Sequence, residues 1–133
     1  MKNRVIIGLL LATVLMLLGR YYLFEWPLRR ALPWGASNIH EHSWDDGFLP
    51  DYTYHLRADL SRDQYLNYVS RLGLKPHAPS GDPHTYRFQW QGVDDVNWWT
   101  PKNVELIHSV TYPDGSTYIG FDGGRVYVYS FDM

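Results

Sequence analysis

The sequence predicts an α+β fold: an N-terminal single transmembrane helix followed by a small antiparallel sheet of five to six strands packed against one helix. Three observations predict it. An apolar run opens the chain, one amphipathic helix is marked at both of its ends, and the C-terminal part alternates apolar and polar residues between glycine-containing turns. The 133 residues leave room for one such domain after the apolar run.

The apolar run covers residues 5–24 and is interrupted once, at Arg20. Twenty helical residues rise about 30 Å, which matches the hydrocarbon core of a bilayer. We therefore expect residues 1–24 to be an uncleaved transmembrane signal anchor that contacts the lipid bilayer through residues 5–24. A cleaved signal peptide is the alternative, but no small-x-small cleavage site precedes Tyr21.

The residues after the run suit a membrane interface, where aromatic rings and long basic side chains collect. We expect residues 25–37 to form a tether, because Pro27, Pro33 and Gly35 argue against a continuous helix. A short N-terminal tail before a single span favours a periplasmic or extracellular domain over residues 38–133, held at the cytoplasmic (inner) membrane. The predicted interface residues are Arg20, Tyr21, Tyr22, Trp26, Arg29, Arg30 and Trp34.

Charge is unevenly distributed along the chain. Residues 1–37 carry five basic and one acidic side chain, whereas residues 38–133 carry seven basic and thirteen acidic ones. An acidic domain repels phosphate backbones, so nucleic acid is not an expected partner. The chain has no cysteine, which excludes disulfides, thiol catalysis and cysteine-ligated metals.

The best-marked helix of the domain is SRDQYLNYVSRLGL. Ser61 and Gln64 have the spacing of a capping box, and Gly73 followed by Leu74 has the pattern of a Schellman motif. Between these signals an apolar stripe repeats at helical spacing, which predicts a helix packed on a sheet. The stripe consists of Tyr65, Leu66, Val69 and Leu72.

Strands are predicted where apolar and polar residues alternate, in DYTYHLRADL (51–60) and TYRFQW (85–90). After Pro101, two turn signals at residues 113–115 and 122–124 separate three further alternating segments. We expect these three segments to form an antiparallel meander, with the helix covering one face of the sheet.

His40 and His42 lie in IHEHSWDD, the stretch with the most ligand-forming side chains. In a strand both point to one face, and His55 of the next strand could join them, so a metal-binding envelope protein is one hypothesis. The spacing fixes no third ligand, and the favoured interpretation is a solvated strand face with no metal and no cofactor. The other histidines are His77, His84 and His108.

Two carboxylate pairs, Asp45–Asp46 and Asp94–Asp95, are candidates for acid–base groups. Neighbouring residues rarely point at one reacting atom, and both pairs lie near turn-forming glycines. No nucleophile elbow, phosphate loop or metalloprotease helix is present. We therefore expect no catalytic residues and no enzyme; a hydrolase of envelope polymers, the remaining alternative, would need a polar cleft near Trp98.

Aromatic residues are in excess, with six Trp, eleven Tyr and five Phe. Trp98 and Trp99 are adjacent, so both cannot face inward from a strand; we expect one to pack on the core and the other to lie near the surface. The favoured interpretation is a loop that seals one end of the sheet, and the alternative is an anchor for a protein partner, a glycan or a lipid headgroup. The candidate partner-binding residues are Trp98, Trp99, His40, His42, His55 and Arg57.

Four short motifs together resemble small uncharacterised bacterial membrane-anchored proteins and lipoproteins. They are an LPxxAxxI element at residues 32–39, LGL at 72–74, a WWxP element at 98–101 and a VYxYS strand at 126–130. The resemblance implies an envelope location and one compact domain, and it carries over no active site. This chain lacks the lipid-acceptor cysteine of the lipoproteins, so a helix is expected to provide the anchor.

These observations predict a non-catalytic, membrane-tethered envelope protein that binds another protein, as an immunity or accessory factor.

Overall fold

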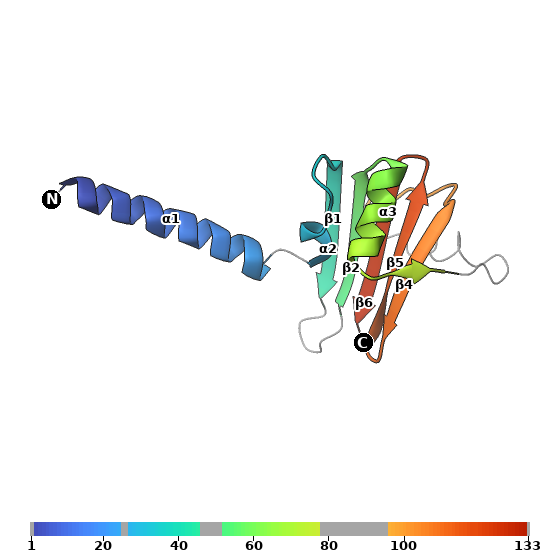
Figure 1. Cartoon of the computed structure of the whole chain (residues 1–133). Helices are drawn as coiled ribbons and strands as arrows, with labels where there is room; N and C mark the ends of the chain where they lie inside the picture. Colours follow the sequence, from blue (N-terminus) through green and yellow to red (C-terminus); the bar gives the residue numbers. More distant parts are fainter. Residues whose placement is uncertain (1, 25–26, 46–51, 78–95, 133) are drawn as a thin grey trace. The chain divides into compact units, whose positions relative to one another are not determined.

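The computed structural model describes residues 2–24, 27–45, 52–77 and 96–132 (Figure 1). The chain divides into two compact units, Met1–Arg30 and Ala31–Met133. The first unit holds α1 (Lys2–Phe24) and α2 (Pro27–Arg30). The second, called here the sheet domain, holds β1 (Ser37–Asp45), β2 (Tyr52–Asp59), α3 (Arg62–Arg71), β3 (Lys75–Pro76), β4 (Leu106–Tyr112), β5 (Gly115–Asp122) and β6 (Arg125–Asp132).

The predicted transmembrane helix requires a correction. Within the described residues, no helix is both long enough and apolar enough to cross a membrane, which contradicts a signal anchor over residues 1–24 and a single-pass membrane protein. The apolar run does form a helix, α1, and Arg20 interrupts the run within it.

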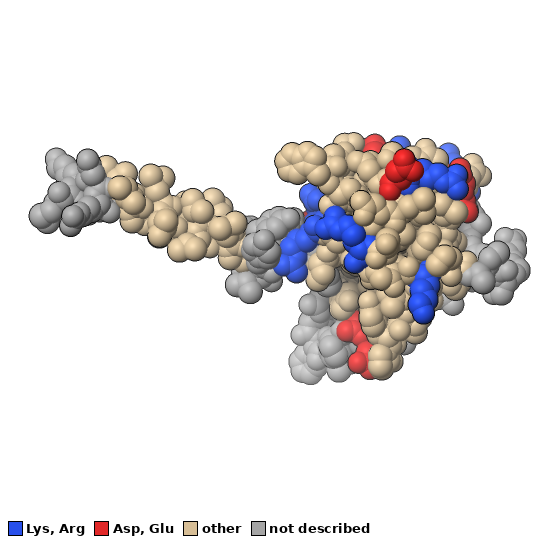
Figure 2. Space-filling view, viewed as in Figure 1, with Lys and Arg blue, Asp and Glu red and all other residues tan. Residues whose placement is uncertain are grey.

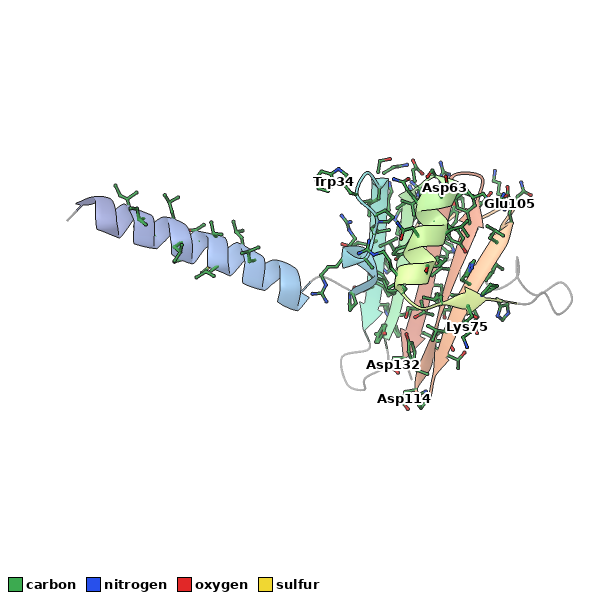
Figure 3. The ribbon with its side chains drawn as sticks, viewed as in Figure 1. Trp34, Asp63, Lys75, Glu105, Asp114 and Asp132 are labelled. Carbon is green, nitrogen blue, oxygen red and sulfur yellow. The ribbon has the colours of Figure 1, made fainter. Side chains whose placement is uncertain are left out.

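The predicted interface residues fall in different places. Trp26 and the side chains of residues 20–22 lie outside the part of the chain that the structure describes. Arg29 and Arg30 lie in α2, which begins at Pro27 as helices commonly do. Trp34 lies on the turn before β1 and is fully exposed (Figure 3).

The described strands form one antiparallel sheet in the order β1-β2-β6-β5-β4-β3. The meander predicted after Pro101 is confirmed as β4, β5 and β6. Pairing of β2 with β6 then joins the first hairpin to the end of the chain, which places β6 at the centre. The strand predicted over residues 85–90 lies outside the described residues, as do Asp46, His84 and the pair Asp94–Asp95.

The helix α3 has the predicted ends. Ser61 and Gln64 exchange both capping-box hydrogen bonds, at 3.2 and 2.8 Å. At the other end the backbone N–H groups of Gly73 and Leu74 donate to Ser70 and Val69, the two bonds of a Schellman motif. Gly73 has φ +70°, a left-handed conformation that glycine adopts without strain.

The central strands are buried on both faces. One face packs under α3 (Figure 1) through rows of cross-strand neighbours, such as Leu56, Val128 and Ile119. The opposite face carries an aromatic cluster that includes Trp99. Residues 54–58 of β2 are therefore buried without interruption, although their sequence alternates apolar and polar side chains.

Gly115, at the start of β5, lies close to the backbone of β6. A Cβ at this position would clash with the backbone oxygen of Phe131. We expect Gly115→Ala to lower the free energy of unfolding by about 2–3 kcal/mol, as overpacking does. Gly123→Asn is the control, because its φ of +55° suits asparagine and its Cβ would meet open space. Urea denaturation measures both; equal stability of the two variants would contradict this packing.

Candidate functional site

Most of the predicted partner-binding residues converge on the face of the sheet opposite α3. Register pairs His42 with His55, and His40 with Arg57, so all four side chains lie on this face. Their interpretation as a solvated face is wrong for β2, where His55 is 2% and Arg57 9% exposed. The cause is the segment containing Trp98 and Trp99, because both indoles lie against the side chains of this face.

Trp99 belongs to the buried aromatic cluster and is 6% exposed. Its ring meets Tyr127 at 5.2 Å and His55 at 4.7 Å between ring centroids, both edge to face. Tyr118 and Tyr129 complete the cluster. Edge-to-face contacts are the arrangement that aromatic quadrupoles favour, so this packing fixes the orientation of the indole. Trp99 is therefore the inward-facing member of the pair.

Trp98 is the outer member and is only partly buried. Its ring stacks on His40 at 5.6 Å between centroids, with 28° between the planes. The Arg57 guanidinium lies 6.0 Å from the centre of the indole and donates from Nη1 to the Trp98 backbone oxygen at 2.7 Å. Trp98 is thus held on two sides while part of its surface stays accessible, as the sequence pattern predicted.

His40 is itself fixed by a short polar chain. Asn38 donates from Nδ2 to Asp59 at 3.2 Å, which leaves its amide oxygen to accept from His40 Nε2 at 2.9 Å. Asn38 has φ +49°, a left-handed conformation that asparagine tolerates better than most residues. Asp59 also accepts from Arg125 at 3.1 Å. The ring of His40 is therefore oriented for stacking on Trp98.

The histidines do not assemble a metal site among the described residues. His42 lies opposite His55, as the metal-binding hypothesis requires. However, no group of three or more histidine, aspartate or glutamate side chains in the described part of the chain is placed to hold a metal ion. His77 instead lies near Ser109, with 3.1 Å between Nδ1 and Oγ.

Tyr65 and His108 form a buried polar pair beneath α3 that the sequence did not indicate. Tyr65 Oη lies 2.8 Å from His108 Nδ1 and 3.1 Å from the backbone oxygen of Ile119. The Tyr65 hydroxyl can donate to the nearer backbone oxygen, that of Ile119, while His108 Nδ1–H donates to the Tyr65 oxygen. Burial raises the pKa of Tyr65 above its usual range and lowers the pKa of His108.

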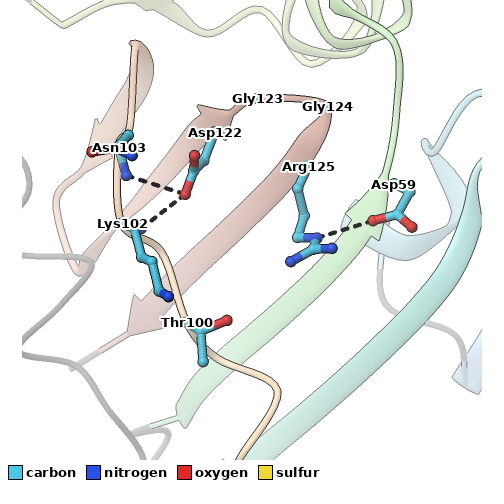
Figure 4. A pocket seen from close by; sticks show the side chains of 8 residues that line it. All are labelled: Asp59, Thr100, Lys102, Asn103, Asp122, Gly123, Gly124 and Arg125. Atoms are coloured by element: carbon cyan, nitrogen blue, oxygen red, sulfur yellow. Dashed lines mark hydrogen bonds and ion pairs between the residues drawn. The ribbon is translucent and has the colours of Figure 1, made fainter.

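A polar pocket of about 580 Å³ lies at the end of the sheet where β5 turns into β6 (Figure 4). Thr100, which lines this pocket, comes two positions after Trp98, so one segment contributes to the pocket and carries Trp98. The turn itself is formed by Gly123 and Gly124, both with positive φ. The pocket is lined by Asp59, Thr100, Lys102, Asn103 and residues 122–125.

Both carboxylates of the pocket have structural partners. Asp122 Oδ2 accepts from the backbone N–H groups of Lys102 and Asn103, at 2.8 and 3.2 Å. Asp59 accepts from Arg125 and Asn38. These bonds fix both carboxylates in the walls of the pocket.

Both charge signs occur on the surface of the sheet domain. Figure 2 shows acidic and basic side chains along its upper edge. Hydrogen bonds with Tyr127 and Asp59 raise the pKa of Arg125, so this residue at the pocket stays positively charged.

Comparisons with protein-family models, with curated proteins and with solved structures found no match for this chain. The resemblance to small bacterial membrane-anchored proteins and lipoproteins stays a prediction.

The buried His108 makes stability depend on pH. Burial lowers its pKa below the ordinary value of 6.5, so the unfolded chain binds a proton more readily than the folded one. Stability from this group is complete above pH 6.5 and falls as the pH decreases below it, by at most about 1.4 kcal/mol per pH unit. Urea denaturation at pH 7.5 and pH 5 should show this loss.

His108→Asn is the control, because its amide can replace the Nδ1 donor but does not titrate. We expect a smaller difference between the two pH values for this variant. The same difference in both proteins would contradict the assignment to His108.

Proposed function

We propose that the protein is a non-catalytic binding domain that docks another protein over Trp98, His40 and Arg57, called here the Trp98 surface. The observation that carries the proposal is the fixed position of Trp98. Its ring stacks on His40, its backbone oxygen accepts from Arg57, and part of its indole is accessible. A partly exposed indole that is held in one orientation is better suited to a protein interface than an indole on a solvated loop.

The energetic reason lies in preorganisation. Tryptophan and arginine are enriched among the few residues that dominate the affinity of protein interfaces. Association normally costs conformational entropy when exposed side chains become ordered. Trp98 is already ordered by His40 and Arg57, so less of that cost arises on binding.

Two further observations favour binding over catalysis. Tyr65 and His108, whose pKa values burial shifts, lie between α3 and the sheet, where a substrate does not reach them. The carboxylates of the polar pocket are held by hydrogen bonds from Arg125, Asn38 and backbone amides. An envelope location and an immunity or accessory role stay predictions.

Site-specific photo-crosslinking in the cells of origin tests the proposal. A photoreactive residue replaces exposed Asn97 in the full-length chain, next to Trp98. The control replaces Asp114, an exposed residue in the turn between β4 and β5 (Figure 3). We expect one saturable protein adduct from position 97 that excess unlabelled protein competes away, and none of that size from position 114. Equal labelling from both positions would contradict the proposal.

The partner so identified allows a quantitative test with purified proteins. We expect Trp98→Ala to weaken binding by about 30-fold, which corresponds to ~2 kcal/mol, typical of a dominant interface residue. Tyr112→Ala is the matched control, because Tyr112 is also an exposed aromatic residue but lies at the β4–β5 turn. Binding unchanged by Trp98→Ala, with the fold retained by circular dichroism, would refute the Trp98 surface.

A further inference from the structure

The polar pocket presents positive charge although its lining is formally neutral. It contains two carboxylates, of Asp59 and Asp122, and two cations, of Lys102 and Arg125. A ligand can interact with those charged groups that are not already fully hydrogen-bonded within the protein. The carboxylates are engaged in such bonds, whereas the cations still have donors to offer.

The carboxylates are engaged within the protein. Asp122 holds the backbone amides of Lys102 and Asn103 through one oxygen. Asp59 uses one oxygen for Arg125 and the other for Asn38. These bonds fix the walls of the pocket and reduce the negative charge that the two groups offer to a ligand.

The cations retain donors. The Lys102 ammonium has three N–H donors and no hydrogen-bond partner among the described residues. Arg125 has five N–H donors, and its ion pair with Asp59 engages Nε–H, at 3.1 Å. Figure 4 shows one terminal nitrogen of Arg125 directed toward the side of the pocket that carries Lys102 and Thr100.

Together these groups offer an ammonium, a planar guanidinium and a hydroxyl around one space. Such donors match the oxygens of an oxyanion, and the guanidinium fork fits a carboxylate in particular. Because the two carboxylates and two cations make the lining formally neutral, a bound carboxylate leaves one net charge in the pocket and a dianionic phosphate leaves two. The volume of about 580 Å³ exceeds the need of a carboxylate alone and leaves room for the group that bears it.

We propose that this pocket binds a carboxylate group, held by Lys102, Arg125 and Thr100. The carboxylate belongs either to the end of a peptide chain or to a small free acid. The site is separate from the Trp98 surface and needs no protein partner for its occupation.

Titration of the full-length ¹⁵N-labelled protein with trialanine, followed by NMR, tests the site. We expect saturable shifts of the backbone amides of Lys102, Asn103 and residues 123–125, weakened by added NaCl. Trialanine with a C-terminal amide is the first control and should bind at least ~10-fold more weakly, since a charge-assisted bond is lost. Equal shifts with the amide, or none with either peptide, would overturn the proposal.

Titrations with acetate and with inorganic phosphate identify the class of ligand. Acetate that binds as tightly as trialanine assigns the site to the carboxylate alone and supports a small free acid, whereas tighter binding of trialanine supports a peptide end. Inorganic phosphate should bind more weakly than acetate at pH 7.5. Phosphate that binds more tightly would overturn the preference for a carboxylate.

Variants locate the binding groups. Lys102→Gln and Thr100→Val both change exposed residues, so we expect the fold to be retained and the affinity for trialanine to fall, by ~10-fold for Lys102→Gln. Lys75→Gln, which changes an exposed lysine on β3, is the matched control and should leave the affinity unchanged (Figure 3). A loss as large for Lys75→Gln as for Lys102→Gln would show general charge attraction and contradict the site.

Discussion

The packing of Trp99 against the sheet determines how the rest of the sheet domain is organised. Among the described residues of the sheet domain, one helix, α3, covers one face of the sheet. The other face of its central strands is covered by the indole of Trp99, edge to face with Tyr127 and His55. Burial on both faces lets β2, β5 and β6 form the core of a small domain.

The segment that carries Trp99 is fixed at both ends. Near its start, Arg57 donates to the backbone oxygen of Trp98. Near its end, Asp122 accepts from the backbone amides of Lys102 and Asn103. Both proposed binding features depend on this arrangement, because the indole of Trp98 and two donors of the pocket, Thr100 and Lys102, project from the same short segment. An ordered segment is the condition under which such side chains bind with little further loss of entropy.

Local signals in the sequence predicted much of the sheet domain. The capping box at Ser61 and the glycine at position 73 defined α3, because they act within one turn of the helix. The turn at Gly123 and Gly124 likewise defined the hairpin of β5 and β6. The adjacent tryptophans indicated one inner and one outer indole. Trp99 is the inner one and Trp98 the outer one.

Contacts between residues that are far apart in the sequence could not be predicted from such local signals. Alternation in β2 marked His55 and Arg57 as solvated, since nothing local shows that Trp98 and Trp99 cover them. The bond between Tyr65 and His108 joins residues 43 positions apart, and neither has a local partner that reveals it. The polar pocket likewise depends on how the segment after Trp98 meets the β5–β6 turn, which spacing alone does not fix.

The central claim is that the segment from Val96 to Asn103 is an integral part of the folded sheet domain and not a flexible loop. Native-state hydrogen exchange of the full-length protein tests it most directly, at the amides of Trp99, Lys102 and Asn103, which donate to Val96 and Asp122. We predict that these amides exchange on the same slow timescale as that of Val128 in β6, because opening the segment requires exposure of the aromatic cluster. Exchange of these three amides at the rate of an unprotected chain, while Val128 stays protected, would contradict the account.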